Sequence, residues 1–241
     1  MNEALISEPM GLLFSASLLA LTLGAYFAGL WAFQKARHFS LLHPLVSSCL
    51  LIASVLYSFD IDYARYQQAN SVFYWLLGPA TVALAIPLNR EFDRIRALAQ
   101  PLLLTLLFGA IAAPLCAVTL AALFGADPLT LLSLTPKSVT TPIALGIAKE
   151  IGALGELTAG VVIFTGVVGA IAGPKLLSLL GVDDERLQGF TLGINAHGVG
   201  TARAFDISPL CGAFSSLALG LTGVLTALTL PTLLLWLSKI L

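Results

Sequence analysis

Three cationic side chains stand beside polar residues in an otherwise apolar chain. Lys137 lies in the stretch LTPKSVTTPIALGIAKEIG (134–152), and His197 and Arg203 lie in GINAHGVGTARA (193–204). Their polar neighbours are Ser138, Thr140, Thr141, Asn195 and Thr201. Cationic groups among hydrogen-bond donors are suited to bind a carboxylate, which accepts charge-assisted hydrogen bonds. These residues form the predicted substrate-binding set.

Backbone features of the same stretches support this prediction. Pro142 suits the first turn of a helix that begins at about Thr141. Such a helix directs free N–H groups and its positive dipole end at the preceding loop, where an anion is stabilised. Gly198 and Gly200 allow close approach to the backbone. We therefore expect Gly198 to belong to the binding set as well.

The composition indicates a membrane protein. Of the 241 residues, 58% are hydrophobic and 10% are charged, and the mean hydropathy is +0.94. A soluble domain carries about 25% charged residues. The net charge of −1 offers no electrostatic basis for binding nucleic acid. The sequence has no common hydrolase or phosphate-loop motif, and its three cysteines lack metal-ligand spacing. We expect no enzymatic activity, no cofactor and no metal site.

The apolar segments predict an all-α, polytopic protein, with residues 1–241 forming a single domain in the lipid bilayer. At about 20 residues per span, there is room for seven or eight transmembrane segments. The long, largely apolar segments cover 10–33, 97–124, 156–181 and 208–240. A shorter segment covers 42–59, and interrupted segments cover 71–89, 129–149 and 187–205.

The interrupted segments contain residues that break helices. The expected breaks are at Gly78, Pro79, Pro136, Pro142 and Gly200. Broken backbone persists at membrane depth only where it is buried in protein or lines a water-filled cavity. We therefore expect the three segments to meet near the membrane centre and to bind the carboxylate there. The similarity of 78–88 to 138–148 leaves open two structural repeats.

Each cationic residue also has a purely structural interpretation. Lys137 can extend its amine to the membrane surface, His197 can be a packed, hydrogen-bonded histidine, and Arg203 can be a cytoplasmic anchor. The presence of all three in interrupted segments favours the binding site, because ionisable groups are costly within a membrane.

The distribution of lysine and arginine predicts that both termini are external, provided that every segment crosses the membrane. The predicted cytoplasmic residues are Lys35, Arg37, Arg90, Arg94, Arg96, Lys149 and Arg203, and the predicted external residues are Arg65, Arg186 and Lys239. A re-entrant segment would invert everything that follows it. Within 156–181, the small residues Thr165, Gly169 and Gly173 share one helix face, which we expect to pack against another helix of the same chain.

Four stretches together resemble the LrgB/CidB family of membrane proteins: LLSLTPKSVTTPIA, GINAHGVGTARA, GAFSSLALGLTGVLTALTLP and LLGPATVALAIPL. The resemblance runs from about residue 40 to the C-terminus, and PKSVTTPIA and HxxGTARA are its most specific parts. The sequence differs from the family pattern at Asn195, where threonine or serine is common, and at Thr222, where asparagine is common.

The resemblance implies two functions that are compatible with one another. The plastid glycolate/glycerate translocator fuses an LrgA-like and an LrgB-like part, which implies a carrier or exporter of small monocarboxylates of the glycolate, glycerate, lactate or pyruvate class. Bacterial members are described as holin/antiholin-like regulators of murein hydrolase activity and autolysis beside a small partner, LrgA or CidA. The resemblance therefore implies a multi-pass protein of the bacterial inner membrane. It leaves open an LrgA/CidA-type partner and a homo-oligomer.

Overall fold

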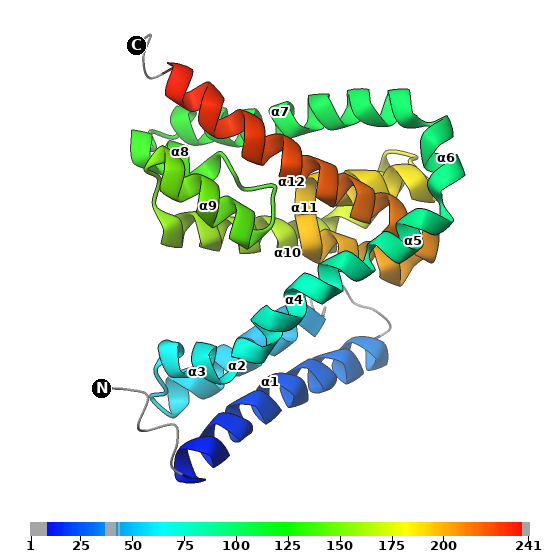
Figure 1. The fold of residues 1–241 in the computed structure, drawn as a ribbon. Coiled ribbons are helices and arrows are strands. Elements are labelled where there is room, and N and C mark those ends of the chain that lie inside the picture. The colour runs from blue at the N-terminus through cyan, green and yellow to red at the C-terminus, as the bar shows by residue number, and fades with distance from the viewer. Residues whose placement is uncertain (1–8, 37–41, 43, 238–241) are drawn as a thin grey trace. The chain divides into compact units, whose positions relative to one another are not determined.

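The computed structural model describes residues 9–36, 42 and 44–237, and its regular structure is helical throughout these residues (Figure 1). The predicted all-α architecture is thus confirmed for this part of the chain. Two compact units are present, Met1–Ala83 and Leu84–Leu241. The candidate binding residues lie in the second unit.

The first unit consists of four helices: α1 (Pro9–Lys35), α2 (Pro44–Ser58), α3 (Tyr63–Ala69) and α4 (Ser71–Ala83). Thr22 ties α1 to the α3 region, because its hydroxyl donates to Oδ1 of Asn70 at 2.8 Å and lies 2.8 Å from the hydroxyl of Tyr66. A polar group buried among apolar helices is stable only when it is paired in this way.

The helix break expected at Gly78 and Pro79 is absent from this unit. Both residues lie inside α4, which continues to Ala83 before the chain turns at Leu84. Proline removes one intrahelical hydrogen bond, and membrane helices tolerate this loss when local adjustments satisfy the freed carbonyl. The sequence prediction was therefore wrong about this position.

The second unit consists of α5 (Ala85–Arg90), α6 (Phe92–Ala97), α7 (Ala99–Leu123), α8 (Pro128–Leu134), α9 (Thr141–Ile151), α10 (Gly155–Leu179), α11 (Glu185–Ile207) and α12 (Pro209–Leu237). Its largest buried cluster joins α7, α11 and α12 through Leu102, Leu106, Phe190, Ile194, Phe214 and Ala218. This packing holds α11 against both α7 and α12.

Among the described residues, five stretches are long and apolar enough to cross a membrane. They are Gly11–Lys35, Ser71–Arg90, Ala99–Leu123, Gly155–Leu179 and Pro209–Leu234. These stretches match the four long apolar segments of the sequence and one of the interrupted ones. The other two interrupted segments, which are shorter or more polar, are absent from this set.

Helix α11 doubles back on itself at His197. This residue has φ 41° and ψ −132°, outside the helical region. A straight helix of 23 residues would be about 34 Å long. Yet Glu185, at the start of α11, accepts a hydrogen bond of 2.6 Å from Ser208, directly after its end. Residues 185–207, the second hairpin, therefore enter and leave at the same end of the unit.

Helices α8 and α9 form a comparable hairpin, residues 128–151, called the first hairpin. The hydroxyl of Ser133 in α8 accepts a 3.0 Å hydrogen bond from the backbone N–H of Leu154, just beyond the end of α9. The carbonyl of Ser133 accepts a 3.1 Å hydrogen bond from the hydroxyl of Thr158 in α10. The chain that leaves α8 therefore returns to the region of Ser133 at the turn between α9 and α10.

Two re-entrant hairpins change the predicted topology, because segment 187–205 does not cross. With α7, α10 and α12 as the crossing helices, one end of the second unit carries Arg90, Arg94, Arg96, Lys175, Arg186 and Arg203, and the other end carries Lys149. By the positive-inside rule, we expect the arginine-rich end to face the cytoplasm. In this arrangement, Lys149 would lie outside and Arg186 on the cytoplasmic side, the reverse of the sequence prediction for both residues.

Candidate functional site

The tips of the two hairpins meet beside α10, and the order of contacts along this helix shows how. Thr158 contacts the first hairpin at Ser133, and Val162 belongs to the same buried cluster as Val139 near the tip. The carbonyl of Val162 also bonds to the side chain of His197, at the tip of the second hairpin. The two hairpins thus approach Val162 from opposite ends of α10.

Small residues on α10 allow the second hairpin to pack closely. A Cβ at Gly169 would lie 2.5 Å from Cβ of Ala196, and one at Gly173 would lie 2.8 Å from Cδ2 of Leu192. The predicted close approach of another helix of the same chain is confirmed at these two glycines. Gly166 continues this face, since a Cβ there would lie 2.6 Å from the His197 ring.

The tip of the first hairpin is built by proline and threonine. Asp127 caps α8 by accepting hydrogen bonds from the N–H groups of Leu129 and Thr130. The chain is non-helical from 135 to 140, and α9 begins at Thr141 with Pro142 in its first turn. Pro136 therefore lies in a non-helical stretch, whereas Pro142 lies inside the first turn of α9. Thr140 occupies the N-cap position but makes no side-chain capping bond.

Lys137 is a half-buried cation at this tip. Its Nζ lies 3.2 Å from the hydroxyl of Ser138, which is buried. No ion pair involves Lys137 within the described part of the chain. An ammonium held by a neutral hydroxyl, without a carboxylate, has capacity for an anion.

His197 forms the tip of the second hairpin and is 4% exposed. Its Nε2 lies 2.9 Å from the carbonyl of Val162. A carbonyl can only accept, so Nε2 carries the proton, and in the neutral ring Nδ1 is an acceptor. The hydroxyl of Thr201 donates to the carbonyl of His197 at 2.9 Å and lies 2.9 Å from the hydroxyl of Ser215 in α12. The tip is therefore anchored to both α10 and α12.

Some predicted residues lie away from this meeting point. Asn195 is exposed, and its amide nitrogen donates to the carbonyl of Thr191 on its own helix at 3.0 Å. Arg203 lies on the return arm of the second hairpin, 3.6 Å from a carboxylate oxygen of Asp206. This ion pair favours the alternative in which Arg203 anchors the protein at the cytoplasmic surface.

The glycines of the second hairpin have separate roles. Gly200 is helical, so the break lies at His197 instead of at Gly200 as predicted. A Cβ at Gly200 would lie 2.6 Å from the carbonyl oxygen of Leu192, so this glycine allows the two arms to pack together. Gly198 is exposed with open space around it. Beside Val162, the first tip carries Lys137, Ser138, Thr140 and Thr141, and the second tip carries His197, with Thr201 one turn further on.

Sequence reasoning missed the contribution of α12. Ser215 and Thr222 are both buried, and Ser215 bonds to Thr201. Hydroxyl residues are frequent in this helix, and their spacing does not distinguish buried from exposed ones. Only the spacing of the apolar residues and glycines of α12 could have indicated which face of this helix is buried.

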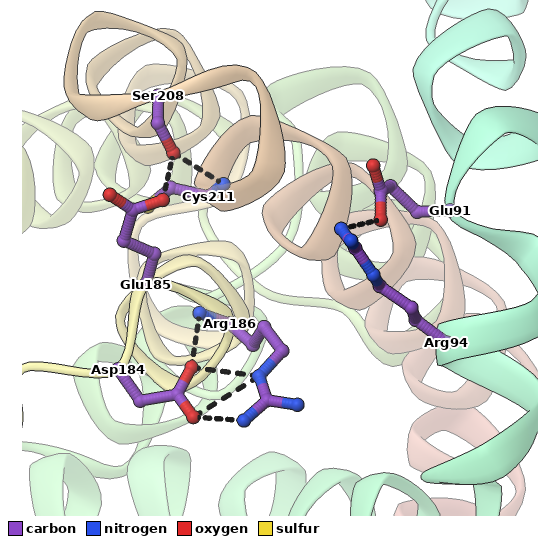
Figure 2. A network of polar contacts seen from close by, with 7 residues as sticks. All are labelled: Glu91, Arg94, Asp184, Glu185, Arg186, Ser208 and Cys211. Atoms are coloured by element: carbon purple, nitrogen blue, oxygen red, sulfur yellow. Dashed lines mark hydrogen bonds and ion pairs between the residues drawn. The ribbon is translucent and has the colours of Figure 1, made fainter.

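A polar cluster closes the base of the second hairpin (Figure 2). The hydroxyl of Ser208 donates to Glu185 and accepts a 3.0 Å hydrogen bond from the N–H of Cys211. By accepting this second bond, Ser208 caps the N-terminus of α12. Asp184 caps α11, accepting from the N–H of Arg186 at 2.9 Å, and also pairs with its guanidinium. These hydrogen bonds lower the pKa of Asp184 from 3.8 to about 2.

The model of the LrgB-like family matches residues 22–236. The chain belongs to the LrgB-like family. This LrgB-like chain is 30% identical over 217 residues to the antiholin-like protein LrgB of Bacillus subtilis, covering 88% of the chain and 92% of the relative.

Other relatives extend over similar lengths. The uncharacterized protein YxaC of Bacillus subtilis is 33% identical over 223 residues, covering 92% of this LrgB-like chain and 96% of YxaC. An uncharacterized protein of Haemophilus influenzae is 31% identical over 206 residues, covering 84% and 89% of the two chains. No solved structure matches the chain. The predicted family is therefore confirmed, and the chain is a multi-pass membrane protein.

Proposed function

We propose that this chain is an antiholin-like protein of the bacterial cytoplasmic membrane that modulates murein hydrolase activity and autolysis. The support is its membership in the LrgB-like family and its similarity to a relative named antiholin-like protein LrgB. The test is expression in a bacterium that lacks its own LrgB-type gene, with and without an LrgA-type partner. We expect the chain to slow detergent-induced lysis and to change the murein hydrolase pattern. Unaltered lysis, with the protein verified in the membrane, would argue against this role.

We further propose that the meeting point of the two hairpins binds small monocarboxylates and passes them across the membrane. The observation that carries this proposal is Lys137, a half-buried ammonium at a hairpin tip with no anionic partner in the described residues. A pore made from simple helices needs no such charge, whereas a carrier places its binding site at broken helices near the membrane centre.

The backbone of both hairpins adds to this positive potential. Helix α9 and the arm after His197 each begin at a tip, so both direct an N-terminal dipole end into the meeting point. The uncapped N–H groups of α9 and the ammonium of Lys137 would bind the carboxylate, with Ser138 donating a further hydrogen bond. Neutral His197 offers Nδ1 to a ligand hydroxyl.

The hairpins also provide a means of alternating access. Because they enter from opposite ends, displacement of the first would open the meeting point to one side, and displacement of the second would open it to the other. Carriers commonly expose a central site by moving one element against the rest. This mechanism keeps the site closed to a continuous leak, as an antiholin-like role requires.

Uptake into proteoliposomes tests the carrier directly. The purified protein should accumulate labelled glycolate, glycerate, lactate or pyruvate, and Lys137→Met should abolish this uptake because it removes the unpaired charge. Lys149→Met is the matched control, since this exposed lysine lies in the last turn of α9. If the wild type takes up none of the four acids, the carrier proposal fails and the antiholin-like role can still stand. If both variants transport normally, Lys137 does not bind the substrate.

A further inference from the structure

Thr222 of α12 carries a buried hydroxyl that no neighbour satisfies. Its side chain is 1% exposed, and its Oγ1 has no hydrogen-bond partner among the residues that the structure describes. Buried hydroxyls in folded proteins are almost always paired, so an exception requires an explanation.

Three other hydroxyls of the same helix use an intrahelical acceptor. Ser216, Thr229 and Thr232 donate to the carbonyl oxygen four residues earlier, at 2.8, 2.7 and 3.1 Å. This intrahelical acceptor is available to any serine or threonine in a helix. Thr222 does not use the equivalent carbonyl of Ala218. Its hydroxyl therefore makes no intrahelical bond and can bond to another partner.

The position of Thr222 lies between the contacts of α12 with the two hairpins. Ser215, two turns earlier on the same face, bonds to Thr201 of the second hairpin. At the next residue, Gly223, a Cβ would lie 3.0 Å from Cδ1 of Ile143, in the first turn of α9. Thr222 thus lies on the stretch of α12 that joins the start of α9 to the tip of the second hairpin.

We propose that Thr222 is a specificity-determining residue of this site, where its hydroxyl bonds to the oxygen on the second carbon of a 2-hydroxy or 2-oxo monocarboxylate. The inference rests on the proposed carboxylate carrier and deepens it. Lys137 and the start of α9 would hold the carboxylate, which every monocarboxylate possesses. Thr222 would recognise the second oxygen, and a hydroxyl suits this task because it can donate to a keto oxygen or accept from a hydroxyl.

The test compares lactate with propionate, which differ only in the 2-hydroxyl. Ligand-induced stabilisation of the purified protein against thermal unfolding gives the affinity for each acid. In the wild type, we expect lactate to bind more tightly than propionate. Thr222→Val should weaken lactate about three- to tenfold, the worth of one hydrogen bond, and leave propionate unchanged. Thr222→Ser, which keeps the hydroxyl, should retain the preference.

Thr229→Val is the matched control, because this exposed threonine of α12 bonds only to its own helix. It should change neither affinity. An unchanged ratio of lactate to propionate affinity in Thr222→Val, or an equal loss of both, would overturn the role of Thr222. Thr222→Ala removes the same hydroxyl and takes the place of the valine variant if that variant does not fold. A wild type stabilised by neither acid nor by glycolate or pyruvate would refute the carboxylate site itself, and the role of Thr222 with it.

Discussion

Replacing Gly189 with alanine should destabilise the protein, because α11 and α12 touch there through their backbones. A Cβ at Gly189 would overlap the carbonyl oxygen of Cys211 and would lie 3.0 Å from its Cα. These are main-chain atoms in the first turn of a helix capped by Ser208, so they cannot rotate aside. Overpacking of this kind costs about 1–3 kcal/mol, against a helix-propensity gain of up to about 1 kcal/mol for alanine.

The expected net loss is about 1 kcal/mol, which corresponds to a fall in Tm of about 2–4 °C for a chain of this size. Thermal unfolding in detergent, followed by size-exclusion chromatography of heated samples, measures the change. Gly220→Ala is the matched control, since a Cβ added at this α12 glycine would have nothing within 4 Å and its φ is not positive. We expect this variant to be as stable as the wild type or slightly more so.

A second variant strengthens the test of the hairpin. Gly193→Ala should act like Gly189→Ala, because a Cβ there would overlap the carbonyl oxygen of Ser215 and lie 2.7 Å from Cβ of Ala218. If both variants matched Gly220→Ala in stability, the entering arm of α11 would not lie against α12. The folded-back conformation of 185–207 would then be refuted.

Four further predictions concern the tips of the two hairpins and the arm and base of the second. Cysteine at 138 or 141 should react with a water-soluble thiol reagent in a background without Cys49, Cys116 and Cys211, and protection of both positions in every condition would exclude an aqueous route to the first tip. Arg203→Lys should transport as well as the wild type, because Arg203 pairs with Asp206 near the surface, and a large loss of transport would mean that Arg203 belongs to the site. His197→Gln should flatten the pH dependence of uptake if the imidazole carries a proton. Asp184→Asn keeps a capping side chain and removes the charge that stabilises the fold above pH 4. Because the folded pKa of about 2 lies below the usual 3.8, this stabilisation should disappear as the pH falls toward 2, and the variant should lose no more than about 1 kcal/mol at pH 7. Equal stability of variant and wild type at pH 7 would show that the ion pair contributes nothing.

The long helices could be predicted from apolar length alone. The segment expected at 10–33 is α1 (Pro9–Lys35), and the helix start expected at about Thr141 is the first residue of α9. In both cases the signal is local: an unbroken apolar run for the first, and a proline in the first turn for the second. Such signals depend little on tertiary contacts.

The hairpins could not be predicted in the same way. The reversal lies at His197, while Gly198 and Gly200 beside it, the residue type that adopts positive φ most readily, remain helical. Contacts that the sequence does not display hold this conformation, above all the bond from His197 to Val162 and the bond between Glu185 and Ser208. Conversely, Gly78 and Pro79 carry a strong local breaking signal, yet α4 continues through them.

The structural repeat lies elsewhere than the similarity of 78–88 to 138–148 suggested. Helix α7 and helix α10 each contain 25 residues, and each is followed by a re-entrant hairpin. The two pairs run in opposite directions, because the first hairpin enters from the end where α7 finishes and the second from the end where α10 finishes. Because the two pairs have opposite orientations, the start of α9 and the start of the arm after His197 approach the middle of α10 from its two ends. This explains why so apolar a chain concentrates lysine, histidine, threonine and proline in two short stretches: they form the two hairpin tips, and burial between long helices satisfies backbone that lipid could not.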